Sequence, residues 1–107
     1  MSQEKKQAIA TYFQANQDRC KKTLELFSMF ANETRFKILC ILAEHDFCVK
    51  DIVEIIDAKH SNVSQQLKML RLSGYVTKER FGKSIVYHLE NNEVRSAIHF
   101  VQQELYT

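Results

Sequence analysis

The stretch AKHSNVSQQLKMLRLSGYVTKERFGKSIVYHL, residues 58–89, decides the fold of this chain. It begins with a polar-faced helical pattern and ends in two short runs of alternating β-branched, aromatic and charged residues, which strands favour. Both glycines of the chain lie within it. Gly74 follows the helical pattern, where glycine ends a helix, and Gly82 separates the two strand-like runs, where a hairpin turns. This order is typical of a helix-turn-helix followed by a β-hairpin wing.

A helical pattern over residues 61–73 separates an apolar side from a polar side. At about 100° per residue, three apolar side chains share one narrow stripe: Val63, Leu67 and Leu70. The opposite face carries Ser61, Gln65 and Lys68. Glutamine can make a bidentate contact with adenine in the major groove of DNA. Ser64 lies on the flank, within reach of a phosphate, while Ser61 either contacts DNA or caps the helix N-terminus.

Two helical patterns precede this one. The first begins after Asn32, a predicted N-cap, and ends near Glu44, and its core candidates are Phe36, Ile38, Leu39 and Leu42. The second covers residues 49–56 with apolar positions at Ile52, Val53, Ile55 and Ile56. A turn over residues 57–60 joins it to the next helix, which is the spacing of a helix-turn-helix pair. Because the remaining chain has neither glycine nor proline, it is predicted to form helices joined by short turns.

Composition bounds the class of protein. The chain has 107 residues, of which 45% are hydrophobic and 26% charged, so one small domain over residues 1–107 is expected. The patterns described above make it a single winged helix-turn-helix domain, predicted to bind DNA. No apolar run approaches the roughly 20 residues of a membrane span, and the first residues lack a signal-peptide core. The odd set of cysteines, Cys20, Cys40 and Cys48, argues against a secreted disulfide framework. We expect a cytoplasmic protein without a membrane partner.

Charge is distributed unevenly along a chain whose net charge is only +2. Residues 59–83 contain six basic residues and one acidic residue, a local charge of +5. Residues 44–57 contain five acidic residues and one basic residue, a local charge of −4. A basic pole of this kind fits either phosphate binding or a solvated charged face. The hydrogen-bonding face of the helix over residues 61–73 favours phosphate and DNA.

Other functional classes are less well supported. The chain has no Gly-rich phosphate loop, no Gly-x-Ser-x-Gly motif and no Cys/His/carboxylate cluster of recognisable spacing, so we predict neither an enzyme nor a cofactor. A winged-helix protein-interaction module is the better alternative. It would require exposed apolar residues on the helix over residues 61–73, where only Met69 and Leu72 qualify.

Four segments together resemble the ArsR/SmtB family of winged-helix repressors. They are FANETRFKIL over residues 30–39, NVSQQLKML over residues 62–70, SGYV over residues 73–76 and VYHL over residues 86–89. The resemblance covers most of the chain. It implies a mainly α fold of about five helices with a two-stranded wing, in a dimeric transcriptional repressor whose fourth helix reads the major groove while the wings touch flanking DNA.

The resemblance also implies which residues contact DNA. Carried over by position, five residues face bases and nearby phosphates: Ser61, Asn62, Ser64, Gln65 and Lys68. The flanking backbone is contacted by Lys78, Arg80 and Lys83. His60, at the start of the same helix, is within reach of a phosphate or a base edge. The remaining histidines, His45, His88 and His99, are scattered and are expected to be surface or turn residues.

Apolar stripes on the two outer helices predict a homodimer. On the C-terminal helix the stripe is Val94, Ile98, Val101 and Leu105. On a long N-terminal helix it is Ile9, Phe13, Cys20, Leu24 and Phe27. We expect both stripes to meet their copies across a two-fold axis, although both helices could instead pack on their own domain. A dimer places two recognition helices roughly 34 Å apart, as an imperfect palindromic operator requires.

Metal sensing is an alternative that the cysteines raise. Residues 48–51, Cys-Val-Lys-Asp, resemble a Cys-Val-Cys-Asp metal box of the family in which Lys50 has replaced one thiolate. A second metal site of the family would fall on Asn91, Glu93, Glu104 and Thr107, where its histidines are missing. A metal-responsive repressor would therefore depend on Cys48 and Cys20, and we predict no complete metal site.

Thiol sensing is the favoured mode of release from DNA. Cys40 resembles the second-helix cysteine of an HlyU/BigR/YgaV-like subgroup of oxidant or sulfane-sulfur sensors, and the subgroup's second cysteine would fall on Thr107. Three options stay open: Cys40 pairs with Cys20, Cys40 acts alone as a sulfenic acid or persulfide, or there is no thiol switch.

Overall fold

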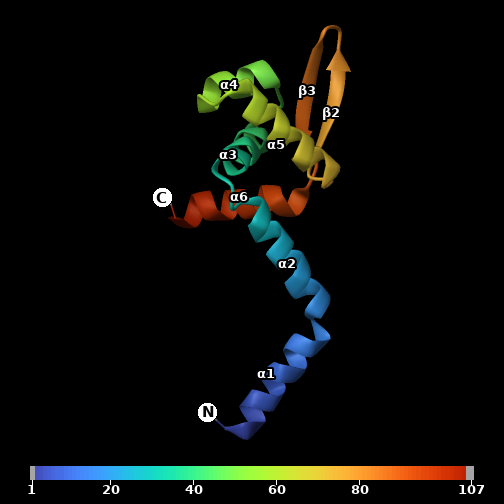
Figure 1. The fold of residues 1–107 in the computed structure, drawn as a ribbon. Coiled ribbons are helices and arrows are strands. Elements are labelled where there is room, and N and C mark those ends of the chain that lie inside the picture. Colours follow the sequence, from blue (N-terminus) through green and yellow to red (C-terminus); the bar gives the residue numbers. More distant parts are fainter. Residues whose placement is uncertain (1, 106–107) are drawn as a thin grey trace.

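The predicted helix-turn-helix and wing form one body, from which two N-terminal helices extend (Figure 1). The computed structural model describes residues 2–105. The mainly helical winged fold is confirmed, with six helices and three strands among the described residues. The elements are α1 (Gln3–Ala15), α2 (Gln17–Met29), α3 (Glu33–Glu44), β1 (Phe47–Cys48), α4 (Val49–Ile56), α5 (His60–Leu72), β2 (Val76–Phe81), β3 (Ser84–Leu89) and α6 (Asn92–Leu105).

The core lies where α3, α4 and α5 pack together against the sheet and α6. The predicted stripe of α5 is confirmed, because Val63, Leu67 and Leu70 are fully buried. The core candidates of α3 are confirmed with one exception. Ile38, Leu39 and Leu42 are buried, whereas Phe36 is only half-buried and its ring packs edge-on against Phe30. In α4 only Ile52 is fully buried, because so short a helix presents one narrow side to the core.

Local signals explain where the helices begin. Asn32 caps α3 as predicted, since its Oδ1 accepts a hydrogen bond from the backbone N–H of Arg35 at 2.9 Å. α4 ends at Ile56, and the next residue, Asp57, adopts a left-handed φ of 51° that turns the chain toward α5. α5 begins at His60, with Lys59 in the N-cap position and no side-chain capping bond within the described chain. Capping by Ser61 is therefore wrong, because this residue already lies in the first helical turn.

Both glycines perform the predicted turns. Gly74 has a φ of 83°, and two hydrogen bonds close α5 around it: Gly74 N–H donates to Arg71 O at 3.1 Å and Tyr75 N–H to Leu70 O at 3.0 Å. This is the Schellman arrangement that ends a helix in the left-handed region. Gly82 has a φ of 62° and is the first residue of the two-residue turn between β2 and β3.

The sheet has three strands, in the order β1-β3-β2, all antiparallel. The two-stranded prediction missed β1, because a strand of two residues has no periodicity and forms only by pairing with β3. In the wing, Val76 pairs with Leu89 and Phe81 with Ser84. Val76 and Leu89 are buried on the core side, which fastens the base of the wing to the body.

The N-terminal stripe lies outside the core. Over residues 3–29, which the structure describes throughout, no side chain is buried, and Figure 1 shows both helices leading away from the body. The prediction of a single long helix is wrong. The chain breaks at Asn16, whose side-chain Nδ2 donates to Tyr12 O at 2.8 Å and ends α1.

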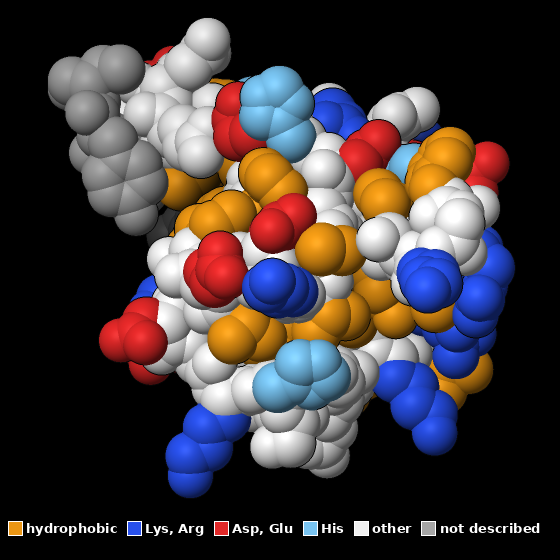
Figure 2. Space-filling view, turned by 90° about the horizontal axis from the view of Figure 1, so that it is seen from above, with side chains coloured by type: hydrophobic (Ala, Val, Ile, Leu, Met, Phe, Trp, Pro, Cys, Tyr) orange, Lys and Arg blue, Asp and Glu red, His pale blue; other side chains and the backbone are white. Residues whose placement is uncertain are grey.

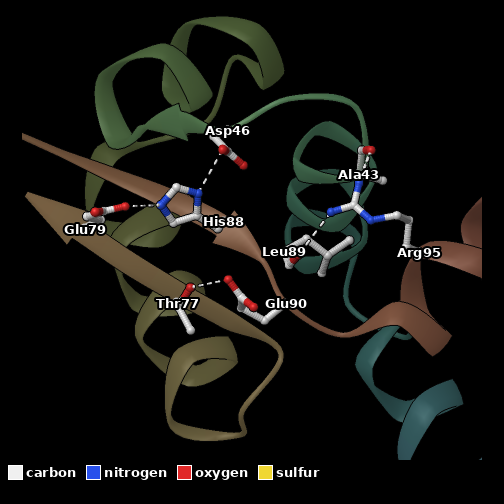
Figure 3. Close-up of polar contacts among 8 residues, drawn as sticks. All are labelled: Ala43, Asp46, Thr77, Glu79, His88, Leu89, Glu90 and Arg95. Carbon is white, nitrogen blue, oxygen red and sulfur yellow. Dashed lines mark hydrogen bonds and ion pairs between the residues drawn. The ribbon is translucent and has the colours of Figure 1, made fainter.

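The C-terminal stripe behaves differently from the prediction. Val94 and Ile98 are buried in the core of their own protomer, so these two residues do not meet a copy. Their burial follows from the packing of α6 on α3, where Arg95 donates to the backbone oxygens of Ala43 and Leu89 (Figure 3). The structure describes the backbone of Leu105 but not its side chain. Within residues 2–105, none of the helices combines the length and apolar composition that a membrane crossing requires.

Candidate nucleic-acid interface

The polar face of α5 points away from the core. Ser61, Gln65 and Lys68 are exposed on the side of the helix opposite its buried stripe. Among the described residues, the side chains of Gln65 and Lys68 make no hydrogen bond or ion pair, so both are free to contact an external ligand. A free amide and a free ammonium on one helical face offer both base-edge and phosphate contacts.

The first turns of α5 contain polar side chains with internal partners. Ser64 is half-buried, and its Oγ lies 3.3 Å from His60 Nδ1. Asn62 is exposed, and its Nδ2 donates to Thr34 Oγ1 at 3.0 Å, from the first turn of α3. That bond uses a donor of Asn62 and fixes the start of α5 against α3. This bond helps to orient the helix, and the predicted contact of Asn62 with DNA stays a prediction.

Arg35 holds the orientation of α5, a role that the sequence did not predict. Its side chain is buried, with only 9% of the residue exposed. Nε donates to Met29 O at 2.8 Å and Nη2 to Ser28 O at 2.8 Å, which fixes the end of α2. Nη1 donates to Gln66 Oε1 at 3.0 Å and lies 3.3 Å from Met69 Sδ, both on α5. One guanidinium thus links α2, α3 and α5.

One weak signal of this role exists in the sequence. Arg35 lies three residues before Ile38 and four before Leu39, on the core side of the predicted helix, and a charged residue on that side requires internal partners. Its acceptors lie in two other segments, the end of α2 and α5. Periodicity along one helix cannot identify them.

The wing presents basic side chains at its outer part. Lys78 and Arg80 follow Val76 on the same face of β2, and Lys83 lies in the turn. All three basic residues are exposed. Figure 2 looks onto the end of the molecule where α4 and the wing tip lie, and Lys and Arg side chains gather along its right and lower edges. Hydrophobic side chains remain visible beside them. The basic pole predicted over residues 59–83 therefore has a counterpart at the surface.

His88 lies between two carboxylates where the wing joins the body (Figure 3). Its Nδ1 is 2.8 Å from Asp46 Oδ2, in the turn before β1, and its Nε2 is 3.3 Å from Glu79 Oε2 on β2. The Nε2 atom is shielded from solvent, and its contact with Glu79 is an ion pair rather than a well-aligned hydrogen bond. The prediction of a surface or turn histidine is wrong for His88, which lies within β3 with 22% of its side chain exposed.

The environment of His88 favours the imidazolium. The hydrogen bond to Asp46 is the largest cause and raises the pKa of His88 above its usual value. Burial of the ring lowers this pKa, but the negative charges of Asp46 and Glu79 raise it further, so the net direction is upward. Protonated His88 is attracted to the carboxylates on both of its sides, and these contacts tie the wing to the turn before β1.

The cysteines are separated, and all three are free. Cys40 is half-buried in α3, where burial and, second, the charge of Glu44 raise the pKa of its thiol. Since the thiolate is the reactive form, this environment slows its chemistry. Cys20 lies on α2 in the extended part of the chain, so a Cys40–Cys20 pair is not formed within this protomer. Thr107, at the position of the subgroup's second cysteine, lies outside the described residues.

The candidate metal box is not assembled. Cys48 Sγ lies 3.2 Å from Asp51 Oδ2, within the same box. Within the described part of the chain, no group of three or more His, Cys, Asp or Glu side chains could hold a metal ion.

Comparison with known proteins identifies the family. Residues 32–78 match the family described as bacterial regulatory protein, arsR family. Over 88 residues the chain is 31% identical to the transcriptional repressor SmtB homolog of a Synechocystis species. The matched region covers 82% of this chain and 67% of that protein. This chain belongs to the ArsR/SmtB family. Its membership among these transcriptional regulators supports the prediction that it is not an enzyme.

Two further relatives extend the comparison. The chain is 35% identical over 81 residues to the transcriptional regulator KmtR of Mycobacterium tuberculosis, a match that covers 76% of this chain. The chain spans only 62% of the length of KmtR. The structure of reduced HlyU from Vibrio cholerae superposes with a TM-score of 0.81 at 26% identity, covering 88% of this chain and 99% of HlyU. The predicted nearness to HlyU-like regulators agrees with this likeness.

Proposed function

We propose that this protein is a homodimeric, sequence-specific DNA-binding repressor that acts in the cytoplasm on an imperfect palindromic operator. The observation that carries the proposal is the exposed face of α5, where Ser61, Gln65 and Lys68 project beside a basic wing. Gln65 and Lys68 have no internal partner among the described residues. Side chains that are both free and held on a rigid helix can contact DNA without first breaking other bonds.

The residues of the interface have different roles in this proposal. Gln65 reads a base, while Lys68 and Ser61 contact bases or nearby phosphates, and His60 with Ser64 contacts phosphate. Asn62 and Arg35 position α5, because both are bonded to neighbouring elements. The basic residues of the wing contact the flanking backbone: Lys78, Arg80 and Lys83.

Dimerisation is supported by the exposed apolar side chains of the arm, which we define as α1 and α2. Four of these side chains are exposed: Ile9, Phe13, Leu24 and Phe27. Phe27 also lines an apolar groove of about 680 Å³ between α2 and α6. Phe100 of α6 lies in the same groove and is also exposed. Apolar surface of this kind marks an interface, and a second copy supplies an identical surface across a two-fold axis.

Release from DNA is proposed to involve Cys40. This residue packs against the core on α3, the helix whose first turns hold α5 through Thr34 and Arg35. Adding an oxygen or sulfur atom to a half-buried Sγ enlarges the side chain at a close-packed position and can shift α3 relative to α5. The raised pKa predicts slow modification. A metal-responsive repressor is the weaker alternative, since no ligand cluster exists among the described residues.

Fluorescence anisotropy on DNA from upstream of the protein's own gene, with a scrambled duplex as control, tests the proposal. Gln65→Ala should reduce the preference among operator variants by about 1–3 kcal/mol. Lys83→Ala should weaken binding to all sequences similarly and flatten the salt dependence. If Gln65→Ala leaves the preference unaltered, base reading by that residue is wrong. No selective binding by the parent protein would favour the protein-interaction module.

The same assay tests release. After treatment with polysulfide, the parent protein should leave the operator while Cys40→Ser stays bound. Identical release of both proteins would remove Cys40 from the mechanism. If neither protein is released, the repressor has no thiol switch under these conditions.

A further inference from the structure

An aromatic side chain is exposed at the tip of the wing. Phe81 is the last residue of β2, and 56% of it is exposed. It pairs with Ser84 immediately before the turn at Gly82 and Lys83. Figure 1 shows the hairpin running past the helices, so the tip is remote from the core that buries the base of the wing. Folding of the body therefore does not explain why this position is aromatic.

The dimer interface proposed above does not explain it either. The exposed apolar residues assigned to that interface lie on α1, α2 and α6. Figure 1 shows α6 across the lower side of the body and α1 at the far end of the arm, both away from the wing tip. The cross-strand neighbour of Phe81 is a serine, whose small polar side chain covers little of the ring. A ring in this position remains available to a ligand that approaches the wing.

Charges around the ring indicate the chemistry of that ligand. Arg80 precedes Phe81 and Lys83 follows it in the turn, and both are exposed. The nearest acid on the same face of the strand, Glu79, lies 3.3 Å from His88, which partly offsets its charge when the imidazole is protonated. Arg80 lies on the opposite face of the hairpin from the ring, because successive side chains of a strand alternate in direction. An exposed ring at a wing tip that carries Lys83 in its turn complements the minor groove of DNA, where phosphates line both rims and stacked bases form the floor.

We propose that Phe81 is a wedge that enters the minor groove next to the site of α5 and partly unstacks one base step. This proposal rests on the DNA-binding function proposed above and adds a specificity-determining residue to it. Insertion bends the duplex, and it is easiest at flexible pyrimidine–purine steps such as TA and CA. In a dimer, one such step at each flank of the operator would be read without a hydrogen bond to a base.

The test places 2-aminopurine at the flanking steps of the operator and measures its fluorescence together with anisotropy. Binding of the parent protein should increase the fluorescence, because the base leaves the stack. Phe81→Ala should abolish this increase and weaken binding about tenfold. Phe81→Leu should retain most of both, since leucine is also an effective wedge. Lys83→Ala, the matched control, should weaken binding while keeping the fluorescence increase.

The possible failures are distinguishable. Selective binding by the parent protein without a fluorescence change would contradict the wedge role of Phe81 but would still support the proposed repressor function. Equal affinity and equal fluorescence for Phe81→Ala and the parent also overturn it, and assign the ring to contact with another protein. Absence of any selective binding by the parent overturns the proposed function itself. Circular dichroism of Phe81→Ala should match the parent, because the ring is exposed and its loss creates no cavity.

Discussion

The body, α3 to α6 with the sheet, and the arm, α1 and α2, are both mainly helical, but they are stabilised in different ways. Every fully buried side chain described lies in the body, from Ile38 to Val94. The arm has 13 residues in each helix and buries none of them. Isolated helices of this length are marginal in water, so the arm depends on a partner surface whereas the body depends on its own core.

Arg35 connects the two regions. Its bonds to Met29 O and Ser28 O hold the last turn of α2, and its bond to Gln66 holds α5. The end of the arm is therefore fastened to the same group that orients the proposed recognition helix. This contact gives assembly of the arm a physical route to the DNA-binding face.

The largest expected effect is a core truncation in the body. Leu67→Ala removes a fully buried side chain between α5 and α3 and should lower the free energy of unfolding by about 2–5 kcal/mol. Leu24→Ala in the arm is the matched control. At protein concentrations too low for dimers to form, it should change the free energy of unfolding little. Urea denaturation at several protein concentrations measures both. Equal losses in dilute protein would mean that the arm packs within its own protomer.

A smaller effect is expected at the connection. Arg35→Met removes three hydrogen bonds and leaves their acceptors in a partly buried site, which should cost about 1–3 kcal/mol. Hydrogen exchange should increase over the last turn of α2 and over α5. The control is Lys37→Met, because the Lys37–Glu33 pair is exposed and contributes less than about 0.5 kcal/mol. Unchanged exchange in α2 would show that Arg35 does not hold the arm.

The arm itself can be tested through the dimer. Phe27→Ser should raise the dimer dissociation constant about tenfold or more, because an exposed ring at the groove between α2 and α6 would be lost from the interface. Sedimentation equilibrium measures the constant. Phe81→Ser is the matched control, since it removes an equally exposed ring from the wing tip and should leave the dimer intact. Dissociation by the control alone would place the interface at the wing.

The smallest expected effect is a pH-dependent change in stability at the base of the wing. The folded state raises the pKa of His88, so its contribution to stability is complete below the unfolded pKa of about 6.5 and is lost as pH rises through the folded value. His88→Gln should therefore destabilise the protein by about 1 kcal/mol near pH 6 and by less near pH 9. Thermal unfolding across this range measures the difference. His45→Gln, on an exposed side chain, is the control, and a parallel pH profile for both variants would contradict the role of His88.

Prediction from the sequence succeeded where signals are local. Asn32, Gly74 and Gly82 mark a helix start, a helix end and a hairpin turn, and each acts through bonds or dihedral angles within a few residues. The exposure of Gln65 and Lys68 followed from helical periodicity, and their contact with DNA stays a prediction. The break at Asn16 was missed because asparagine is tolerated within helices and has no strong breaking effect.

The remaining errors concern features that depend on contacts between distant segments. β1 exists only through β3, and the stripe of α6 could be assigned to the core or to a copy until the packing of α6 on α3 was known. The three groups Asp46, His88 and Glu79 meet only because the register of the sheet brings them together. No spacing in the sequence indicates such a cluster.

The sequence by itself determined the order of the helices and strands, the two glycine turns and the polar face of α5, because caps, left-handed residues and apolar periodicity act over one or two turns of chain. Only the tertiary structure decided that Arg35 links three helices, that His88 lies between two carboxylates, and that the arm is left without a core. Those features depend on which surfaces remain after the core has packed. Packing is a property of the whole chain rather than of any segment.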